Sequence, residues 1–187
     1  MYALVENNEI KEILINTRAL TINDIHYPKN IFTLWSVEEK EAIGIYEIVY
    51  DNSNKKDGTF YTNTDVSHAF ADGKVTASYG TATGKKVEDT VNADDSITLG
   101  LRSLKKENIK QQANNLLTTT DWYIIKAVDV ESYSAPANIV TYRANIRSKS
   151  NEMETAIENA AVIDALAALY VYTDGSRPLG EFPTLET

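Results

Sequence analysis

The sequence predicts an α+β fold, with a β-rich N-terminal part at residues 1–79 and a helical C-terminal part at residues 101–187. Residues 1–79 hold short runs of β-branched and aromatic side chains, separated by Asn, Asp and Gly turn signals. From residue 101 onward, the apolar residues recur mostly with helical spacing. Residues 80–100 are rich in Gly, Thr, Asp and Asn, and we expect them to form a flexible connector.

The chain begins with a predicted β-hairpin. Residues 2–5 and 10–15 are two apolar-rich runs, and Asn7 and Asn8 lie between them. Asn tolerates the left-handed backbone region that tight hairpin turns require. We therefore expect the two runs to pair as antiparallel strands.

A short capped helix is predicted next. Ser36 and Glu39 have the spacing of a capping box, in which each side chain accepts a hydrogen bond from the backbone of the other residue. Gly44 is suited to end the helix because glycine readily adopts the left-handed conformation. Three further strands are predicted, at residues 45–50, 59–62 and 74–79.

The C-terminal part is predicted to hold three helices. The first runs from residue 101 to residue 117, where three threonines end it. Residues 122–126 form a short apolar segment that we predict to be extended. Pro136 suits the first turn of a second, longer helix, and an Ala-rich third helix is predicted at residues 162–170.

The second of these helices carries a heptad pattern. Ile139, Ile146, Met153 and Ala160 lie at seven-residue spacing, which suits a helix that packs along another helix. One interpretation is a core seam within the chain, against the helix at residues 162–170. The other is a self-association seam between copies.

Composition excludes several classes of function. The chain has no cysteine, so it has no disulfide and no thiolate site for zinc. Its net charge of −9 argues against general nucleic-acid binding, and no apolar run is long enough for a membrane span. The first residues lack the features of a secretory signal. We accordingly predict no nucleic acid, no membrane insertion and no cofactor.

Candidate catalytic residues are few. His26 and His68 are far apart in sequence, and we expect surface or strand-face positions for them rather than a metal or general-base role. Asp94 and Asp95 would act as a glycosidase-like pair only beside an aromatic platform for sugars, so a solvated loop is the favoured interpretation. We predict no catalytic and no metal-binding residue.

One block of the sequence is more distinctive than its physical pattern. A helix ending in Leu-Leu leads into Thr120-Asp121-Trp122, and Pro136 then precedes Tyr142-Arg143 and Arg147. This order resembles the C-terminal region of small tail proteins of tailed bacteriophages, including tail-fibre proteins and tail-fibre assembly chaperones. Weaker similarity occurs at residues 1–7, 34–46, 60–61 and 72–76.

The resemblance implies a role in architecture rather than catalysis, because this group has no established active site. Within the block, we expect Asp121 to cap a helix or to form a salt bridge near the Leu117 helix end, and Trp122 to fill the core. Arg143 and Arg147 are expected one turn apart on the next helix.

The function expected from the resemblance is that of a non-enzymatic virion protein of a phage tail, made in the host cytoplasm. It would belong to the fibre, the baseplate or an adaptor, form a homo-oligomer and bind other tail proteins. A tail-fibre assembly chaperone is the first alternative. A glycan-binding or glycan-cleaving tail component is the second.

Overall fold

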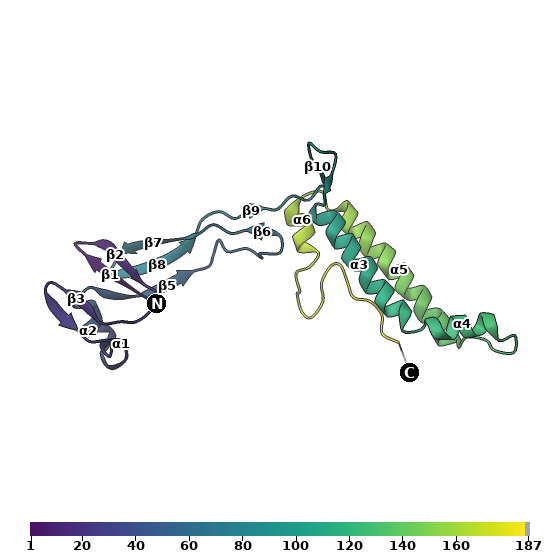
Figure 1. The fold of residues 1–187 in the computed structure, drawn as a ribbon, viewed down its shortest axis with the longest axis horizontal. Helices are drawn as coiled ribbons and strands as arrows, with labels where there is room; N and C mark the ends of the chain where they lie inside the picture. Colours follow the sequence, from purple (N-terminus) through teal and green to yellow (C-terminus); the bar gives the residue numbers. More distant parts are fainter. Residues whose placement is uncertain (186–187) are drawn as a thin grey trace. The chain divides into compact units, whose positions relative to one another are not determined.

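The computed structural model describes residues 1–185 and confirms the α+β fold (Figure 1). The chain divides into two compact units, residues 1–83 and residues 84–187. Within the described residues, the first unit holds a five-stranded sheet, a two-stranded sheet at residues 20–27 and two short helices, and the second holds two long helices, two short helices and a small hairpin. The flexibility expected for residues 80–100 stays a prediction. In the structure, residues 90–98 of this segment contain a two-stranded sheet.

The elements of the first unit follow one another closely. Its strands and helices are β1 (Tyr2–Glu6), β2 (Glu9–Leu14), β3 (Leu20–Ile22), β4 (Ile25–Tyr27), α1 (Ile31–Leu34), α2 (Val37–Glu41), β5 (Ile45–Asp51), β6 (Tyr61–Thr62), β7 (Val66–Ala71) and β8 (Lys74–Tyr79). Five of them form one sheet in the order β2-β1-β5-β8-β7, in which only β5 and β8 run parallel. The edge strands β2 and β7 approach each other, so the sheet is curled.

Local signals shape this unit as the sequence predicts. Asn7 and Asn8 both adopt positive φ in the turn between β1 and β2. The capping box is present, with the Ser36 amide donating to Glu39 Oε2 at 2.7 Å and the Glu39 amide donating to Ser36 Oγ at 3.2 Å. Gly44 has φ +83°, and a Cβ there would lie 2.4 Å from the Val5 carbonyl oxygen.

Both faces of the sheet are covered by apolar side chains. In β1, Leu4 packs with the cluster that includes Ile31 and Phe32 of α1. Its neighbours Ala3 and Val5 belong to a second cluster. This alternation follows from the pleat, because successive side chains in a strand point to opposite faces. The first unit therefore buries apolar residues on both sides of one sheet.

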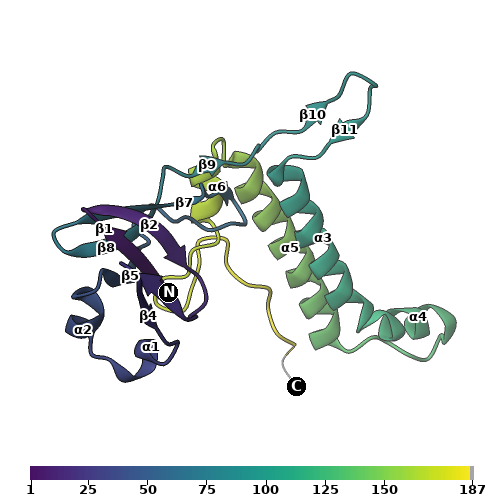
Figure 2. The ribbon, with the colours of Figure 1, turned by 60° about the vertical axis from the view of Figure 1, so that its left-hand side comes forward.

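The second unit is built on a helical hairpin. Its elements after β9 (Thr83–Gly84) are β10 (Thr90–Val91), β11 (Ile97–Thr98), α3 (Leu101–Thr118), α4 (Asp121–Asp129), α5 (Ala137–Asn159) and α6 (Ile163–Ala168). The long helices α3 and α5 pack side by side, with the β10–β11 hairpin at one end of α3 and α4 at the other (Figure 2).

Ion pairs show that α3 and α5 run antiparallel. Lys106 pairs with Glu158 and Lys110 with Glu154, so residue numbers increase along α3 as those of their partners decrease along α5. Within the described residues, no helix is both long and apolar enough to cross a membrane.

The heptad residues Ile139, Ile146, Met153 and Ala160 are all buried inside the unit. The helix that packs along α5 is α3, whereas the sequence favoured the helix predicted at residues 162–170. The physical reason is length: α5 has 23 residues and α6 only six, which corresponds to about 35 Å against about 9 Å. A helix as short as α6 cannot cover the full seam.

The prediction of an extended segment at residues 122–126 is wrong, because these residues lie inside α4. Ile124 and Ile125 favour a strand by propensity, but five residues are too few for periodicity to decide. The first turn of α4 contains Asp121, whose negative charge favours a helix N-terminus. The charge of Asp121 at the first turn is consistent with the helical conformation of this segment.

Candidate interaction surface

The side chain of Arg143 joins three elements at one end of the hairpin. It extends from α5, and its Nη1 donates to the carbonyl oxygen of Leu117 at 2.6 Å and to Thr120 Oγ1 at 2.7 Å. The same nitrogen lies 2.8 Å from Asp121 Oδ1. The salt bridge expected for Asp121 is thus present. It links the start of α4 to Arg143 of α5.

These contacts are strong because the Arg143 side chain is only 9% exposed. A buried guanidinium requires partners, since leaving it without them would carry a large desolvation cost. The Leu117 carbonyl oxygen, in the last turn of α3, also accepts from the backbone amide of Thr120 at 3.0 Å and from Thr120 Oγ1 at 2.9 Å. Arg143 therefore adds a charged donor to the turn that joins α3 to α4.

Arg147 and Tyr142 lie beside this contact. Arg147 is one turn further along α5, as predicted, and its Nη1 reaches the Arg143 carbonyl oxygen at 3.4 Å. Tyr142 is buried with Ala113 and Ile146 between the long helices, where Phe182 of the C-terminal segment also packs. These residues form the support beneath α4.

The helix α4 is apolar, yet none of its residues is buried. Trp122, Ile125 and Val128 recur every three residues and are 59%, 58% and 80% exposed. We call these three residues the apolar face of α4. The expectation that Trp122 fills the core is wrong, because the residue lies on a helix that projects beyond the α3–α5 core.

The indole of Trp122 is held by neighbours even though it is exposed. The Lys126 ammonium lies 5.0 Å from the Trp122 ring centroid and 4.4 Å from that of Tyr133. The rings of Trp122 and Tyr123 meet edge to face at 4.9 Å. Such cation–π and ring contacts fix the orientation of an aromatic side chain. Trp122 is therefore a preorganised apolar projection.

Two segments near α4 contain no charged residue. Residues 111–120 at the end of α3 and residues 132–142 at the start of α5 contain no Asp, Glu, Lys or Arg. Surfaces of soluble proteins ordinarily carry many charges, whereas the centres of protein–protein interfaces are depleted of them. We call residues 111–142 the tip of the hairpin. The charges of the tip are Asp121, Lys126, Asp129 and Glu131, in and just after α4, and the depletion of charge is confined to the two segments.

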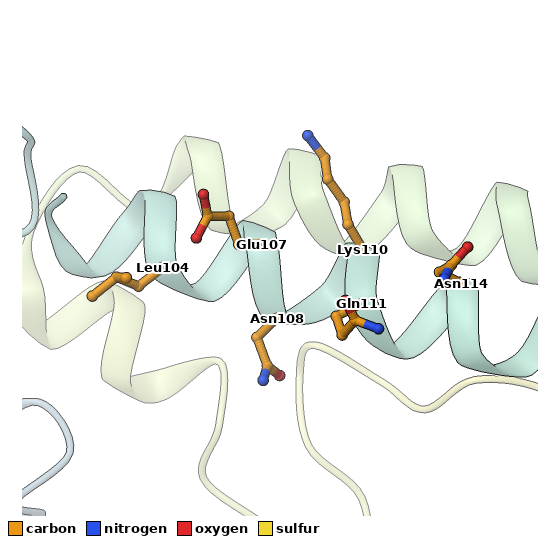
Figure 3. A pocket seen from close by; sticks show the side chains of 6 residues that line it. All are labelled: Leu104, Glu107, Asn108, Lys110, Gln111 and Asn114. Carbon is orange, nitrogen blue, oxygen red and sulfur yellow. The ribbon is translucent and has the colours of Figure 1, made fainter.

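A shallow hollow on α3 is a weaker candidate. Its lining side chains all come from this one helix, and they point in different directions rather than toward a common centre (Figure 3). Leu104, Glu107 and Gln111 are among them. Small-molecule sites enclose their ligand with convergent polar groups, and this hollow lacks that geometry.

None of the candidate catalytic residues belongs to the tip. His26 is exposed on β4, and His68 is half-buried on β7. Asp94 accepts a hydrogen bond from Ser96 Oγ at 2.6 Å, and this contact lowers the pKa of the Asp94 carboxyl. A glycosidase acid requires a raised pKa instead. Within residues 1–185, no group of three His, Asp or Glu side chains is arranged to hold a metal ion.

The sequence analysis identified residues that fix α4 in place but did not identify the exposed apolar residues of α4 itself. Asp121 and Arg143 were singled out, whereas Ile125, Val128 and Tyr133 were not. The available signal was the three-residue spacing of Trp122, Ile125 and Val128, which indicates one side of a helix.

The chain matches no family model, and neither a curated protein nor a solved structure is significantly similar to it.

Proposed function

We propose that the chain is a non-enzymatic structural protein of a bacteriophage tail that works through protein–protein contacts at the tip of its helical hairpin. The observation that carries this proposal is α4, an apolar helix without a buried residue. A solvent-exposed apolar helix is costly unless a partner covers it. Arg143 holds the helix in place, so the surface is ready for contact before a partner arrives.

The resemblance to phage tail proteins supplies the biological setting of the proposal. The residues that carry it include Asp121 and Arg143, and these are also the residues that fix α4. A structural role for the block follows from this coincidence. The protein would occupy the fibre, the baseplate or an adaptor of the virion after synthesis in the host cytoplasm. It would act as a homo-oligomer and contact other tail proteins.

The proposal is tested by the protein content of purified phage particles. Mass spectrometry of particles is expected to detect the chain at a stoichiometric level. Val128→Glu, which places a charge on the apolar face, is expected to reduce its incorporation. Ile97→Glu is the matched control, because Ile97 is also largely exposed (62%, against 80% for Val128) but lies on β11 at the other end of α3. Particles that lack the chain would contradict the proposal.

A tail-fibre assembly chaperone is the second candidate function. The resemblance covers such proteins too, and an exposed apolar tip also suits a protein that binds a fibre during maturation and then leaves. Co-expression distinguishes the two functions. A chaperone makes the fibre soluble and is absent from particles, whereas a structural protein remains in them. A glycan-cleaving component has less support, and turnover of an envelope polysaccharide that Asp94→Asn abolishes would be required to establish it.

A further inference from the structure

We infer that the apolar face of α4, formed by Trp122, Ile125 and Val128, docks in an apolar groove of another tail protein, and that Lys or Arg side chains line the rim of this groove. The inference rests on the proposed function and names the chemistry of the partner. Three observations carry it: the exposed apolar helix, the carboxylates at the end of this helix, and the orientation of Lys126.

The position and spacing of the apolar face suit a helix that a groove receives. The helix α4 lies beyond the packed length of α3 and α5, and none of its residues is buried (Figure 2). Helices that bind grooves present apolar anchors three or four residues apart, which is the spacing of Trp122, Ile125 and Val128. With nine residues, α4 is about 14 Å long. The groove therefore needs to cover only two to three helical turns.

The apolar face ends at two carboxylates that lack a counter-ion. Asp129 is the last residue of α4, Glu131 follows the helix end, and both residues are exposed. Within residues 1–185, neither carboxylate forms a salt bridge with a Lys, Arg or His side chain. A helix C-terminus carries a partial negative charge, so it favours cations and repels carboxylates. The end of α4 consequently offers a place for a cation that the described part of the chain does not fill.

Lys126 does not neutralise this end of the helix. It belongs to the last turn of α4, but its ammonium lies over the rings of Trp122 and Tyr133, at 5.0 Å and 4.4 Å from their centroids. Asp121, the carboxylate at the other end of α4, is already paired with Arg143 at 2.8 Å. A partner therefore meets an anchored indole at one end of the face and unpaired negative charge at the other.

This charge selects a basic-rimmed protein groove over other occupants. A second copy of α4 would bring the same carboxylates on a chain with a net charge of −9, so like charges would meet. Nucleic acids and anionic lipid surfaces are negative as well. A Lys or Arg at the groove rim would instead pair with the carboxylates and with the helix end. Opposite charges placed in this way steer the partners together and fix their register.

The test is a photo-cross-link from the apolar face in purified phage particles. Val128→benzoylphenylalanine places a photoreactive group on the face, and mass spectrometry identifies the attached peptide. We expect an adduct with a different tail protein, at a segment that carries Lys or Arg. Ile97→benzoylphenylalanine is the matched control, since Ile97 is also exposed but lies on β11, and it should not give this adduct. Ile125→benzoylphenylalanine provides a second position if the first variant is not incorporated.

Charge reversal separates this contact from the stability of α4. Asp129→Lys together with Glu131→Lys should lower the yield of the Val128 adduct roughly tenfold or more, because like charges then meet at the groove rim. The same change should preserve or raise the thermal midpoint of the helical unit, since cations suit a helix C-terminus. Glu47→Lys together with Glu107→Lys changes the net charge equally at exposed positions outside the tip and should leave the yield unchanged.

Four results would overturn the inference: an adduct with a second copy of the chain, an adduct at a segment without Lys or Arg, a yield that charge reversal at the tip does not lower, and a yield that the control change lowers equally. Particles that contain the chain but give no adduct with another protein also overturn it, and they leave the proposed function intact. Particles without the chain contradict both.

Discussion

The sheet of the first unit and the hairpin of the second use their apolar residues differently. The curled sheet covers both of its faces, since Leu4 and Ala3 of one strand serve two separate clusters. The hairpin buries one side of each long helix and leaves α4 without a buried residue. The first unit also exposes single apolar side chains, such as Ile15 and Leu34, whereas the second exposes an entire apolar helix. Such a helix gains free energy when a partner covers it.

Within the second unit, buried apolar residues are expected to stabilise the fold, and exposed ones on α4 are proposed to contact a partner. Ile146 is fully buried between α3 and α5, and Ile125 is 58% exposed on α4. The two residues have the same chemistry, but only the first contributes a filled core. The same substitution made at Ile146 and at Ile125 therefore measures how far the stability of the unit depends on the apolar face of α4.

The largest effect is expected from Ile146→Ala. Loss of a fully buried isoleucine leaves a cavity and should lower the free energy of unfolding by roughly 2–5 kcal/mol. Ile125→Ala should change it by less than about 0.5 kcal/mol, because more than half of this residue is already exposed to water. Chemical denaturation monitored by circular dichroism compares the two. Equal losses would show that α4 belongs to the core and would contradict the distinction.

The next effect concerns the contact that fixes α4. Arg143→Met removes bonds to the Leu117 carbonyl and to Asp121, and charge-assisted bonds of this kind contribute about 2 kcal/mol. Hydrogen exchange of the α4 amides should become faster, while amides of the sheet unit keep their rates. Arg147→Met is the control, since within the described residues the Arg147 side chain makes only a long hydrogen bond, of 3.4 Å, to the Arg143 carbonyl oxygen of its own helix. Unchanged hydrogen exchange of the α4 amides in Arg143→Met would show that Arg143 does not hold α4 in place.

A smaller effect is expected in the sheet unit. Ser36→Ala removes the hydroxyl that accepts from the Glu39 amide and should cost about 1 kcal/mol. The change should lower the thermal midpoint of the first unit, reported by the adjacent Trp35, and leave the helical unit unaffected. A simultaneous shift of both units would show that they unfold together and would weaken their treatment as separate structures.

The smallest effect depends on pH. The Asp89 carboxylate accepts from the Gly100 amide at 2.8 Å and from Ser103 Oγ at 3.0 Å, and these bonds hold its pKa below the ordinary value. Because the folded pKa is the lower one, this stabilisation is complete above about pH 4 and is lost as pH falls through the folded pKa. Asp89→Asn should flatten the acid dependence of the thermal midpoint of the helical unit. Asp95→Asn, in the turn of the same hairpin, should retain it.

The sequence allows prediction of the features that depend on neighbouring residues. Asn7 and Asn8 form a turn because their own backbone preferences suit it, and Ser36 caps a helix because its partner is three residues away. The α+β class follows from the same local patterns. Heptad spacing likewise predicts that Ile139 and Ile146 are buried.

The remaining features depend on contacts between distant residues. Arg143 bonds to Leu117 and Thr120, which lie 26 and 23 residues away, and no local pattern specifies those partners. The exposure of Trp122 follows from the position of α4 beyond the packed length of the hairpin. A tryptophan is usually largely buried, so the exposure of Trp122 follows from the packing of α3 and α5 and not from its residue type.

The oxidation rate of Trp122 in the free chain and in purified particles tests most directly that the tip is a contact surface. The chain has two tryptophans, one in each unit, and mass spectrometry measures their oxidation by hydroxyl radicals separately. The account predicts that Trp122 is oxidised several-fold more slowly in particles than in the free chain, while Trp35 keeps its rate. Trp122 oxidation that is equally fast in both would contradict it.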